Sequence, residues 1–392
     1  MSDALCTICI PAFQAAPFIA RTLDCAQAQS ERAIAIHVSV DQSDDETADI
    51  CEARAALDPR IRVSRQGQRV GWSDNTNCLI RDVQTPFFFL YFHDDLIADT
   101  YVERLCGLLR SRPDAATAHG DMKHFGATEH VAAGAAYEGG SFERQFQFLE
   151  GKHQPPLLRA MTRTNARRRM DIFVPSSRAG ANGAHHVYVL GLLAAGASLH
   201  APEVLYQRHN MRSGGLTESW RQMSFAQVRD AFEDNAEAVM NLRMGDGVRE
   251  LQRLVAYLFV MTRMRLAEQE REIVDPIPAA AVSPHFVDFS PLRALKGAEA
   301  GLLKRALSAY ARLLYVEGDQ CERRRDFGGA LDRMAASAIA DAGEGRARGR
   351  IDHLQRKVAR PASALERAVA DGVLRRQEAE RLAILLESEF AS

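Results

Sequence analysis

The sequence predicts an α/β fold: a Rossmann-like, mostly parallel sheet with helices on both faces, followed by an all-helical C-terminal region. Over the first 120 residues, short apolar runs alternate with stretches of helical periodicity. The run Pro86–Phe92 is apolar and aromatic throughout, as in a strand buried on both faces of a parallel sheet. From residue 219 onward, helix-forming residues dominate.

The individual elements follow from these patterns in chain order. Strands are predicted over residues 5–10, 34–40, 61–63, 86–92, 115–120 and 199–206. Helices are predicted over residues 18–28, 47–56, 74–83, 100–110 and 184–195. The stretch 126–178 is rich in Gly, Ala, Arg and His and indicates only loops and short helices. Further helices are expected over residues 228–244, 248–266, 302–314, 330–340 and 365–390.

Length and composition set the domain organisation. A chain of 392 residues exceeds the usual size of one hydrophobic core, so we expect domains over residues 1–215 and 216–392, with a proline-rich joint near 275–291. A hydrophobic share of 46% and a charged share of 26% argue against a fully disordered chain. The net charge of -2 gives no overall attraction to nucleic acid, so an anionic ligand must be held by local groups.

Cysteine usage and apolar runs predict a cytoplasmic protein. The seven cysteines are scattered, and the start Met-Ser-Asp is not followed by an apolar signal stretch. Cys6 and Cys9 form a C-x-x-C pair inside an apolar run, which favours buried strand residues over a metal site. The longest apolar runs fall short of the ~20 residues that a membrane span needs. Any membrane contact would therefore be peripheral, at the inner surface.

Polar residues gather where the predicted strands end. The loops over residues 11–16, 41–47, 66–77 and 93–97 each follow a strand. Ligands of open parallel sheets bind at the carboxyl ends of the strands. These four loops are therefore the expected ligand site.

The fourth loop carries neighbouring carboxylates, Asp94 and Asp95, directly after the aromatic strand. Mg2+ and Mn2+ prefer carboxylate oxygen, and such a cation can neutralise a departing diphosphate. The pattern therefore indicates a metal-diphosphate site. The alternative is a solvated pair that caps the following helix.

The four loops together resemble family 2 glycosyltransferases, which have the GT-A fold, over residues 4 to about 215. The resemblance implies that Asp41 binds a base N–H, that Asp94 contacts ribose or metal, and that Asp95 binds metal. Phe92 stands where the family's Asp-x-Asp-Asp motif has its first aspartate. The other implied nucleotide contacts are Pro11, Ala12, Phe13, Gln14, Gly71, Trp72, Asn77 and His93. In the turn after the second strand, the alternative is that Ser43 and Asp44 merely cap the next helix, which leaves Asp41 without a role, and for Trp72 the alternative is plain packing.

The resemblance also assigns the remaining catalytic roles. The family's catalytic base, an acidic residue, is replaced by His185, next to His186, and either imidazole could take the acceptor's proton at neutral pH, bind phosphate or metal, or simply pack. Asp121, at the end of the fifth strand, is a candidate ligand of the acceptor hydroxyl. The segment after the last strand implies that the diphosphate is approached by Arg208, His209 and Arg212.

The sequence thus predicts a metal-dependent, inverting glycosyltransferase that uses Mn2+ or Mg2+. Its donor is a nucleotide-diphospho-sugar, with UDP favoured over GDP or TDP, and its acceptor is a hydroxyl of a glycan or lipid-linked molecule, as in cell-surface polysaccharide biosynthesis. A non-catalytic nucleotide-sugar-binding scaffold and a sugar nucleotidyltransferase are the alternatives. A nucleotidyltransferase should have a glycine-rich phosphate loop with a basic residue after the first strand, and this sequence has no such loop between Pro11 and Pro17. Dimerisation through the helical region and lipid contact by the basic stretch 346–360 are further hypotheses.

Overall fold

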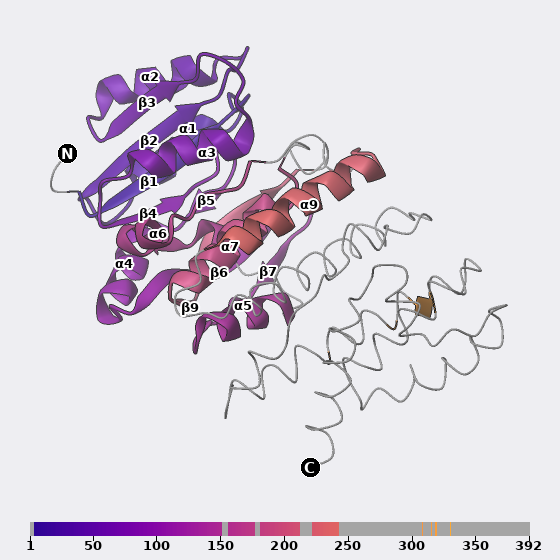
Figure 1. The fold of residues 1–392 in the computed structure, drawn as a ribbon. Coiled ribbons are helices and arrows are strands. Elements are labelled where there is room, and N and C mark those ends of the chain that lie inside the picture. Colours follow the sequence, from indigo (N-terminus) through magenta and orange to yellow (C-terminus); the bar gives the residue numbers. More distant parts are fainter. Residues whose placement is uncertain are drawn as a thin grey trace, which may run out of the picture. The chain divides into compact units, whose positions relative to one another are not determined.

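The computed structural model describes residues 4–150, 156–176, 181–211 and 222–242, together with residues 308, 315, 318, 319 and 330. The chain divides into two compact units, Met1–Gly245 and Asp246–Ser392. All elements described below belong to the first unit (Figure 1). The expected domain boundary after residue 215 and the joint near 275–291 stay predictions. The basic stretch 346–360 and the helices predicted beyond residue 242 lie outside the described segments, apart from the single residues 308 and 330.

A nine-stranded, mixed sheet forms the centre of this unit, in the order β3-β2-β1-β4-β8-β6-β9-β5, with β7 paired to β6. The first four strands of this order are parallel to one another, and β6 is parallel to β9. The short strand β8 lies antiparallel between β4 and β6 and joins the two parallel parts. The strands are β1 (Cys6–Ala12), β2 (Ile34–Val40), β3 (Ile61–Arg65), β4 (Phe87–Leu90), β5 (Leu96–Ile97), β6 (Ala115–Gly126), β7 (His130–Ala132), β8 (Met161–Arg163) and β9 (Ala197–Asn210).

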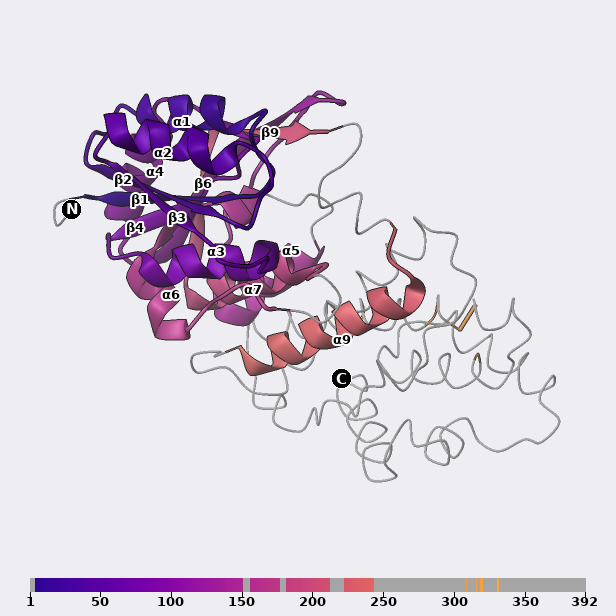
Figure 2. The ribbon, with the colours of Figure 1, turned by 90° about the horizontal axis from the view of Figure 1, so that it is seen from above.

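Helices cover both faces of the sheet, as Figure 2 shows from above. One apolar core lies between the sheet and helices α1, α2 and α4, and includes Leu23, Cys51 and Leu105. The other lies against α3 and α7 and includes Leu79 and Tyr188. The helical elements are α1 (Ile19–Gln27), α2 (Thr47–Leu57), α3 (Gly71–Asp82), α4 (Tyr101–Ser111), α5 (Ser141–Glu150), the 3-10 helix η1 (Pro156–Arg159), α6 (Thr164–Met170), α7 (Ala184–Ala195) and α9 (Phe225–Asn241).

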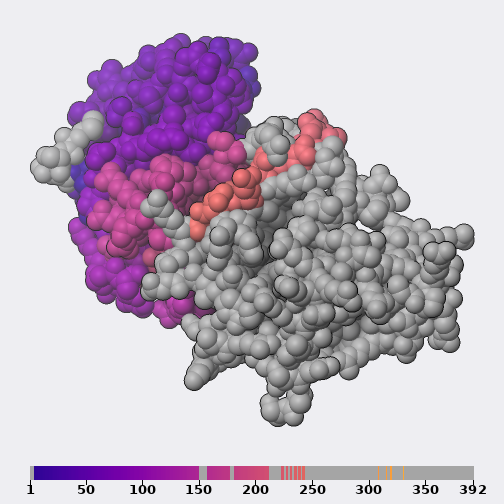
Figure 3. Space-filling model, viewed as in Figure 1, coloured from indigo at the N-terminus to yellow at the C-terminus, as the bar shows by residue number. Residues whose placement is uncertain are grey.

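The alternation of residues along the central strands divides the two cores. Ile8 and Phe89 face the α1 side, whereas Cys9 and Phe88 face the α3 side, because successive side chains of a strand point to opposite faces. Both faces of β1 and β4 are therefore buried, which explains why these strands are apolar throughout. Cys6 and Cys9 are buried strand residues, as predicted. In the space-filling view, the indigo and magenta parts of the unit pack directly against each other (Figure 3).

The predicted fold class is confirmed, and most element bounds agree within a few residues. The stretch 126–178 differs most, because it contains β7, α5, η1, β8 and α6. These elements are short, and β8 has only three residues, so no periodicity can build up within them. Strand β6 continues to Gly126, six residues beyond its predicted end, because it pairs along its length with β9.

One row of paired residues fixes the level of the strands relative to one another. Phe88 of β4 and Thr117 of β6 both pair with Thr162 of β8, and Thr117 also pairs with Ser198 of β9. Because β8 is antiparallel to both, β4 and β6 run in the same direction. Asp121 on β6 and Phe92 after β4 each lie four residues beyond this row, toward the carboxyl edge of the sheet.

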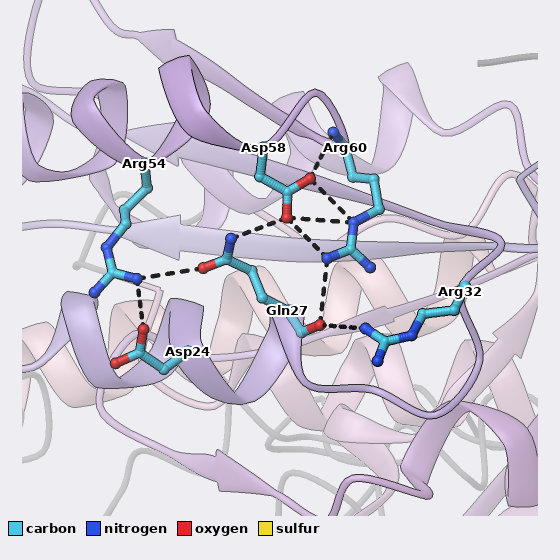
Figure 4. A network of polar contacts seen from close by, with 6 residues as sticks. All are labelled: Asp24, Gln27, Arg32, Arg54, Asp58 and Arg60. Carbon is cyan, nitrogen blue, oxygen red and sulfur yellow. Dashed lines mark hydrogen bonds and ion pairs between the residues drawn. The ribbon is translucent and has the colours of Figure 1, made fainter.

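A polar network ties α1 to the turn before β3 (Figure 4). The Asp58 carboxylate accepts hydrogen bonds from the Arg60 guanidinium, at 2.8 Å from Nη2, and from Gln27 Nε2 at 2.9 Å. Arg60 Nη2 and Arg32 Nη1 both donate to the Gln27 carbonyl oxygen at 3.2 Å. The bonds from Arg60 hold the pKa of Asp58 well below its ordinary value, although burial alone would raise it. The carboxylate thus stabilises the fold only when it is ionised.

We expect Asp58→Asn to lower the free energy of unfolding by about 1–3 kcal/mol at pH 7, because hydrogen bonds to a charged group are lost. The pKa is lower in the folded than in the unfolded chain. This stabilisation is therefore present above the unfolded pKa of about 3.9 and is lost as pH falls toward the folded pKa. Urea unfolding of both proteins from pH 7 to pH 3 measures this. A difference that stays constant down to pH 3 would contradict the role of the charge.

None of the helices within the described segments is long and apolar enough to cross a membrane.

Candidate functional site

Asp95, after β4, is a buried centre of hydrogen bonds at the carboxyl edge of the sheet. Its side chain is 1% exposed. Oδ2 accepts from Arg159 Nε at 2.9 Å and from Tyr206 Oη at 2.8 Å, and Oδ1 accepts from the His209 N–H at 2.8 Å. The carboxylate thus joins the loop after β4 to η1 and to β9.

Arg159 is the positive partner of Asp95 and lies between aromatic rings. Its Cζ is 4.6 Å from the Phe92 ring centroid and 5.3 Å from that of Tyr206. Burial alone would lower the pKa of Arg159, but the Asp95 charge outweighs this and raises it. Phe92 stands where the family has an aspartate, and its ring attracts the guanidinium of Arg159 through a cation–π contact.

Asp94 differs from its neighbour because its carboxylate faces His209 rather than an arginine. Asp94 Oδ2 lies 3.7 Å from His209 Nδ1, and both side chains are less than one-fifth exposed. Burial, and then repulsion from Asp95, raise the pKa of Asp94. His209 Nδ1 is buried, and no described residue forms a hydrogen bond with it. An imidazole nitrogen and a carboxylate oxygen thus face each other without completing a hydrogen bond.

This pair fits a divalent cation. Carboxylate oxygen and imidazole nitrogen are both ligands of Mn2+-like cations, and an orphaned buried nitrogen beside a carboxylate is unfavourable unless something is bound. Within the described segments, no group of three or more His, Cys, Asp or Glu side chains is placed to hold a metal. A cation here would therefore have few protein ligands and take the others from phosphate and water, as Mg2+ sites commonly do. Asp95, whose oxygens already accept three hydrogen bonds, is the less available of the two aspartates.

Asp41, at the end of β2, organises the loop before α3. It is 1% exposed, and its oxygens accept hydrogen bonds from the backbone N–H groups of Gln42, Val70 and Gly71. Its Oδ2 also lies 2.9 Å from Arg69 Nε. Arg69 Cζ in turn lies 3.1 Å from the centroid of the Phe13 ring. A planar cation thus covers the aromatic ring beside the Asp41 carboxylate.

The loop after β1 is held in a strained shape. Gln14 has φ of 44°, in the left-handed region that non-glycine residues rarely adopt. Its N–H donates to Ser43 Oγ at 3.0 Å, and its side-chain amide donates to Asp44 Oδ1 at 2.7 Å. Pro11 and Ala12 end β1, and the Pro11 carbonyl oxygen lies 3.2 Å from His93 Nδ1. The first, second and fourth predicted loops thus come together.

Asn77 and Trp72 lie on α3, which starts at Gly71. The Asn77 amide forms two hydrogen bonds with the Val174 backbone, at 2.8 Å and 3.0 Å. Asn77 is 3% exposed, so its observed contacts anchor α3 to the segment after α6. Trp72 packs at the border of the α3-side core. Nucleotide contacts of both side chains stay predictions.

The remaining candidates lie on β6, α7 and β9. Asp121 Oδ1 lies 2.7 Å from His200 Nε2. His185 and His186 are the second and third residues of α7, with ring centroids 3.8 Å apart. Arg208 lies on β9, close enough to Asp94 and Asp95 to interact electrostatically, although burial lowers its pKa. Arg212 lies outside the described segments.

Sequence reasoning missed the partners that hold the aspartates. Arg159 carries no motif signal and reaches Asp95 from a position 64 residues away. Tyr206 opens the segment that resembles the end of the family's catalytic domain, but it was given no role there, and it reaches Asp95 from 111 residues away. Arg69 lies in a loop that was singled out for Gly71 instead. Only the position of Arg69, three residues before a tryptophan in a strand-end loop, could have suggested it.

Comparison with known proteins assigns the N-terminal part of the chain to a family. The model of glycosyl transferase family 2 matches residues 7–173. These residues belong to glycosyl transferase family 2. The family 2 segment contains Asp41, Asp94, Asp95 and Arg159, while His185, His200 and His209 lie beyond it. The protein is a glycosyltransferase. No curated protein matches the chain significantly.

Solved structures agree on the GT-A fold of this glycosyltransferase. Staphylococcus aureus TarS 1-349 in complex with UDP-GlcNAc is 14% identical, with a TM-score of 0.55, over 94% of this chain and 92% of that chain. The complex of the same protein with UDP is 13% identical, with a TM-score of 0.54, over 85% and 90%. At this identity, the likeness concerns the fold alone.

Proposed function

We propose that the protein transfers a sugar from a nucleoside-diphosphate donor, preferably a UDP-sugar, to a hydroxyl of a glycan or lipid-linked acceptor, with inversion and with help from a divalent cation. The observation that carries this proposal is the Asp94–His209 pair at the carboxyl edge of the sheet. There a buried imidazole nitrogen lies 3.7 Å from a carboxylate oxygen and has no hydrogen-bond partner within the described segments. The TarS structures that share the fold hold UDP and UDP-GlcNAc, which supports a UDP-sugar donor.

Asp94 and His209 would hold the cation. Asp95 is a positioning residue for His209 and a further candidate ligand. When bound, Mn2+ or Mg2+ supplies positive charge that stabilises the leaving diphosphate. Arg208 adds a second positive charge close to Asp94. Asp95 keeps His209 in place, because its carboxylate accepts a hydrogen bond from the His209 N–H.

The base of the nucleotide would bind beside Asp41 and Phe13. Asp41 can accept a hydrogen bond from a ring N–H, and Phe13 offers a face for stacking. Arg69 now occupies that face and pairs with the same carboxylate. A base that stacks on Phe13 must therefore displace the Arg69 guanidinium, which can then donate to the base or the phosphates.

His185 and His186 begin α7 and would border the acceptor. The cytoplasmic location, the peripheral membrane contact and a homodimer through the helical region remain hypotheses attached to this proposal.

A thermal-shift screen with UDP, GDP, TDP and CMP conjugates, each with and without Mn2+, tests the donor and the cation together. We expect UDP-sugars to raise the melting temperature most, and only in the presence of Mn2+, because a ligand that binds the folded state alone stabilises it. At a ligand concentration of 100 times Kd, this stabilisation is about 2.7 kcal/mol. Binding without release of UDP from any donor would favour a non-catalytic scaffold. Equal shifts with and without Mn2+ would contradict the cation site.

A further inference from the structure

An inverting transfer needs a group that takes the proton of the acceptor hydroxyl as the hydroxyl attacks the sugar. The aspartates of the site described above do not suit this role. Asp94 would hold the cation, Asp95 pairs with Arg159, and Asp41 accepts hydrogen bonds from backbone N–H groups. The start of α7 offers histidines, but the positive end of a helix dipole disfavours the imidazolium that forms when a histidine takes a proton. Another carboxylate at the same edge of the sheet meets the requirement better.

Asp121 lies at this edge. It lies on β6 four residues beyond Thr117, just as Phe92, two residues before Asp94, lies four residues beyond Phe88, and both Thr117 and Phe88 pair with Thr162. Helix α7 leads through Gly196 directly into β9, and β9 is parallel to β6. The first residues of α7 therefore lie toward the carboxyl edge as well. Asp121, the cation site and the start of α7 thus share the carboxyl edge of the sheet.

The hydrogen bonds of Asp121 leave one of its oxygens available. Oδ1 accepts from the Gly134 N–H at 2.8 Å and lies 2.7 Å from His200 Nε2. In the described part of the chain, Oδ2 has no hydrogen-bond partner. The side chain is 17% exposed, so a small polar group can reach it.

The surroundings hold this carboxylate in one orientation. Burial alone would raise the pKa of Asp121, but the bonds from Gly134 and His200 outweigh it and hold the pKa below its ordinary value. The carboxylate is therefore ionised at neutral pH. A Cβ at Gly134 would lie 2.7 Å from His200 Cδ2, so only glycine lets this loop approach the pair closely.

A second layer of polar groups supports His200. The ring of His119 lies 5.4 Å from that of His200, and burial lowers the pKa of His119 to about 3, so His119 is neutral. His119 Nδ1 lies 3.2 Å from Ser198 Oγ, which accepts a hydrogen bond from Thr117 Oγ1 at 2.8 Å. His200 thus packs against a neutral imidazole ring that is itself held by Ser198.

We propose that Oδ2 of Asp121 takes the proton of the acceptor hydroxyl and that His200 is a positioning residue for it, an assignment that rests on the proposed function. The hydroxyl oxygen forms a bond to the anomeric carbon as its proton passes to Oδ2. The bond between the anomeric carbon and the diphosphate oxygen breaks, and its electron pair stays on the nucleoside diphosphate. The proton then leaves Asp121 to water. An acidic residue of strand β6 thus acts as the catalytic base, in place of the acidic residue that is missing at the start of α7.

The variant Asp121→Asn tests this, because asparagine keeps an oxygen for Gly134 and His200 but replaces Oδ2 with an NH2 group that cannot take a proton. With UDP-GlcNAc as donor, water as acceptor and UDP release as readout, we expect kcat to fall by about 100-fold or more, since a general base contributes 10^2 to 10^4. KM for UDP-GlcNAc and the thermal shift with UDP should stay within about threefold of the wild-type values. Sodium formate should restore part of the activity of Asp121→Gly. The matched control is Asp114→Asn, an exposed aspartate that pairs with Arg112.

Two further variants separate positioning from folding. His200→Ala should lower kcat by about tenfold, whereas His200→Gln, whose side chain still donates a hydrogen bond, should restore most of the loss. Unchanged kcat in Asp121→Asn, or a larger loss in His185→Ala that imidazole restores, would overturn the assignment. If the wild-type protein releases no UDP from any donor that binds it, the proposed function fails, and the assignment of Asp121 fails with it.

Discussion

Asp94→Asn is expected to lower the rate of UDP release by roughly 100- to 1000-fold. A cation at a departing diphosphate contributes several kcal/mol of charge stabilisation, and each 1.36 kcal/mol corresponds to a factor of ten. The variant should also lose the Mn2+-dependent part of the thermal shift with UDP. Binding of UDP without Mn2+ should persist, because a negative charge next to the diphosphate has been removed.

The same substitution should not destabilise the protein. Asp94 is buried next to the Asp95 carboxylate, and both effects raise its pKa, so its charge opposes folding at neutral pH. We expect the free energy of unfolding of Asp94→Asn to equal or exceed that of the wild type by up to about 1 kcal/mol, as is common where a site is strained for function. Urea unfolding without metal measures this. A clearly less stable Asp94→Asn with unchanged Mn2+ dependence would mean that Asp94 is structural.

Asp95→Asn is expected to have the opposite profile, with a loss of about 3–5 kcal/mol in the free energy of unfolding. Removing one partner of a buried ion pair leaves the other charge uncompensated, and here Arg159 would remain among Phe92 and Tyr206. The Tyr206 hydroxyl and the His209 N–H would also lose a charged acceptor. Activity should fall as well, because His209 and β9 lose their anchor.

A double-mutant cycle identifies the cause of this loss. Arg159→Met alone should destabilise the protein similarly, and the double variant should lose less than the sum of the two single variants, because no unpaired charge remains. The control pair is Arg65 with Asp49, both about half or more exposed, where the same substitutions should cost less than about 1 kcal/mol. If Asp95→Asn has wild-type stability but no Mn2+ dependence, Asp95 is a metal ligand and not the structural centre inferred from its contacts.

The two neighbouring aspartates show how far the sequence reaches. Their position after an apolar strand was enough to predict a site at the carboxyl edge, since strand ends and turn residues are local signals. Which aspartate would be buried under an arginine was not predictable, because Arg159 and Tyr206 come from η1 and β9. The same holds for Asp41: its strand-end position is local, whereas the contact between Arg69 and Phe13 depends on how two loops meet.

The stretch from residue 126 to 178 is the part of the fold that sequence patterns predicted least well. Strand β8 has three residues, and its place between β4 and β6 is set by pairing with both neighbours rather than by its own alternation. Yet this strand aligns Asp121 with the loop after β4. The sequence predicts which strand ends form the site. How far the strands are shifted along one another depends on the pairing of β8 with β4 and β6.

The amino-acid sequence alone determined the alternating strands and helices, the apolar centre of the sheet and the strand-end loops that carry Asp41, Asp94 and Asp95, because periodicity and turn chemistry act over a few neighbouring residues. Only the tertiary structure decided which carboxylate is neutralised by Arg159, which faces the orphaned nitrogen of His209, and which is held by His200 with one oxygen available. The charge and availability of a carboxylate depend on burial and on partners far away in the chain. Those partners come together only when the sheet is assembled.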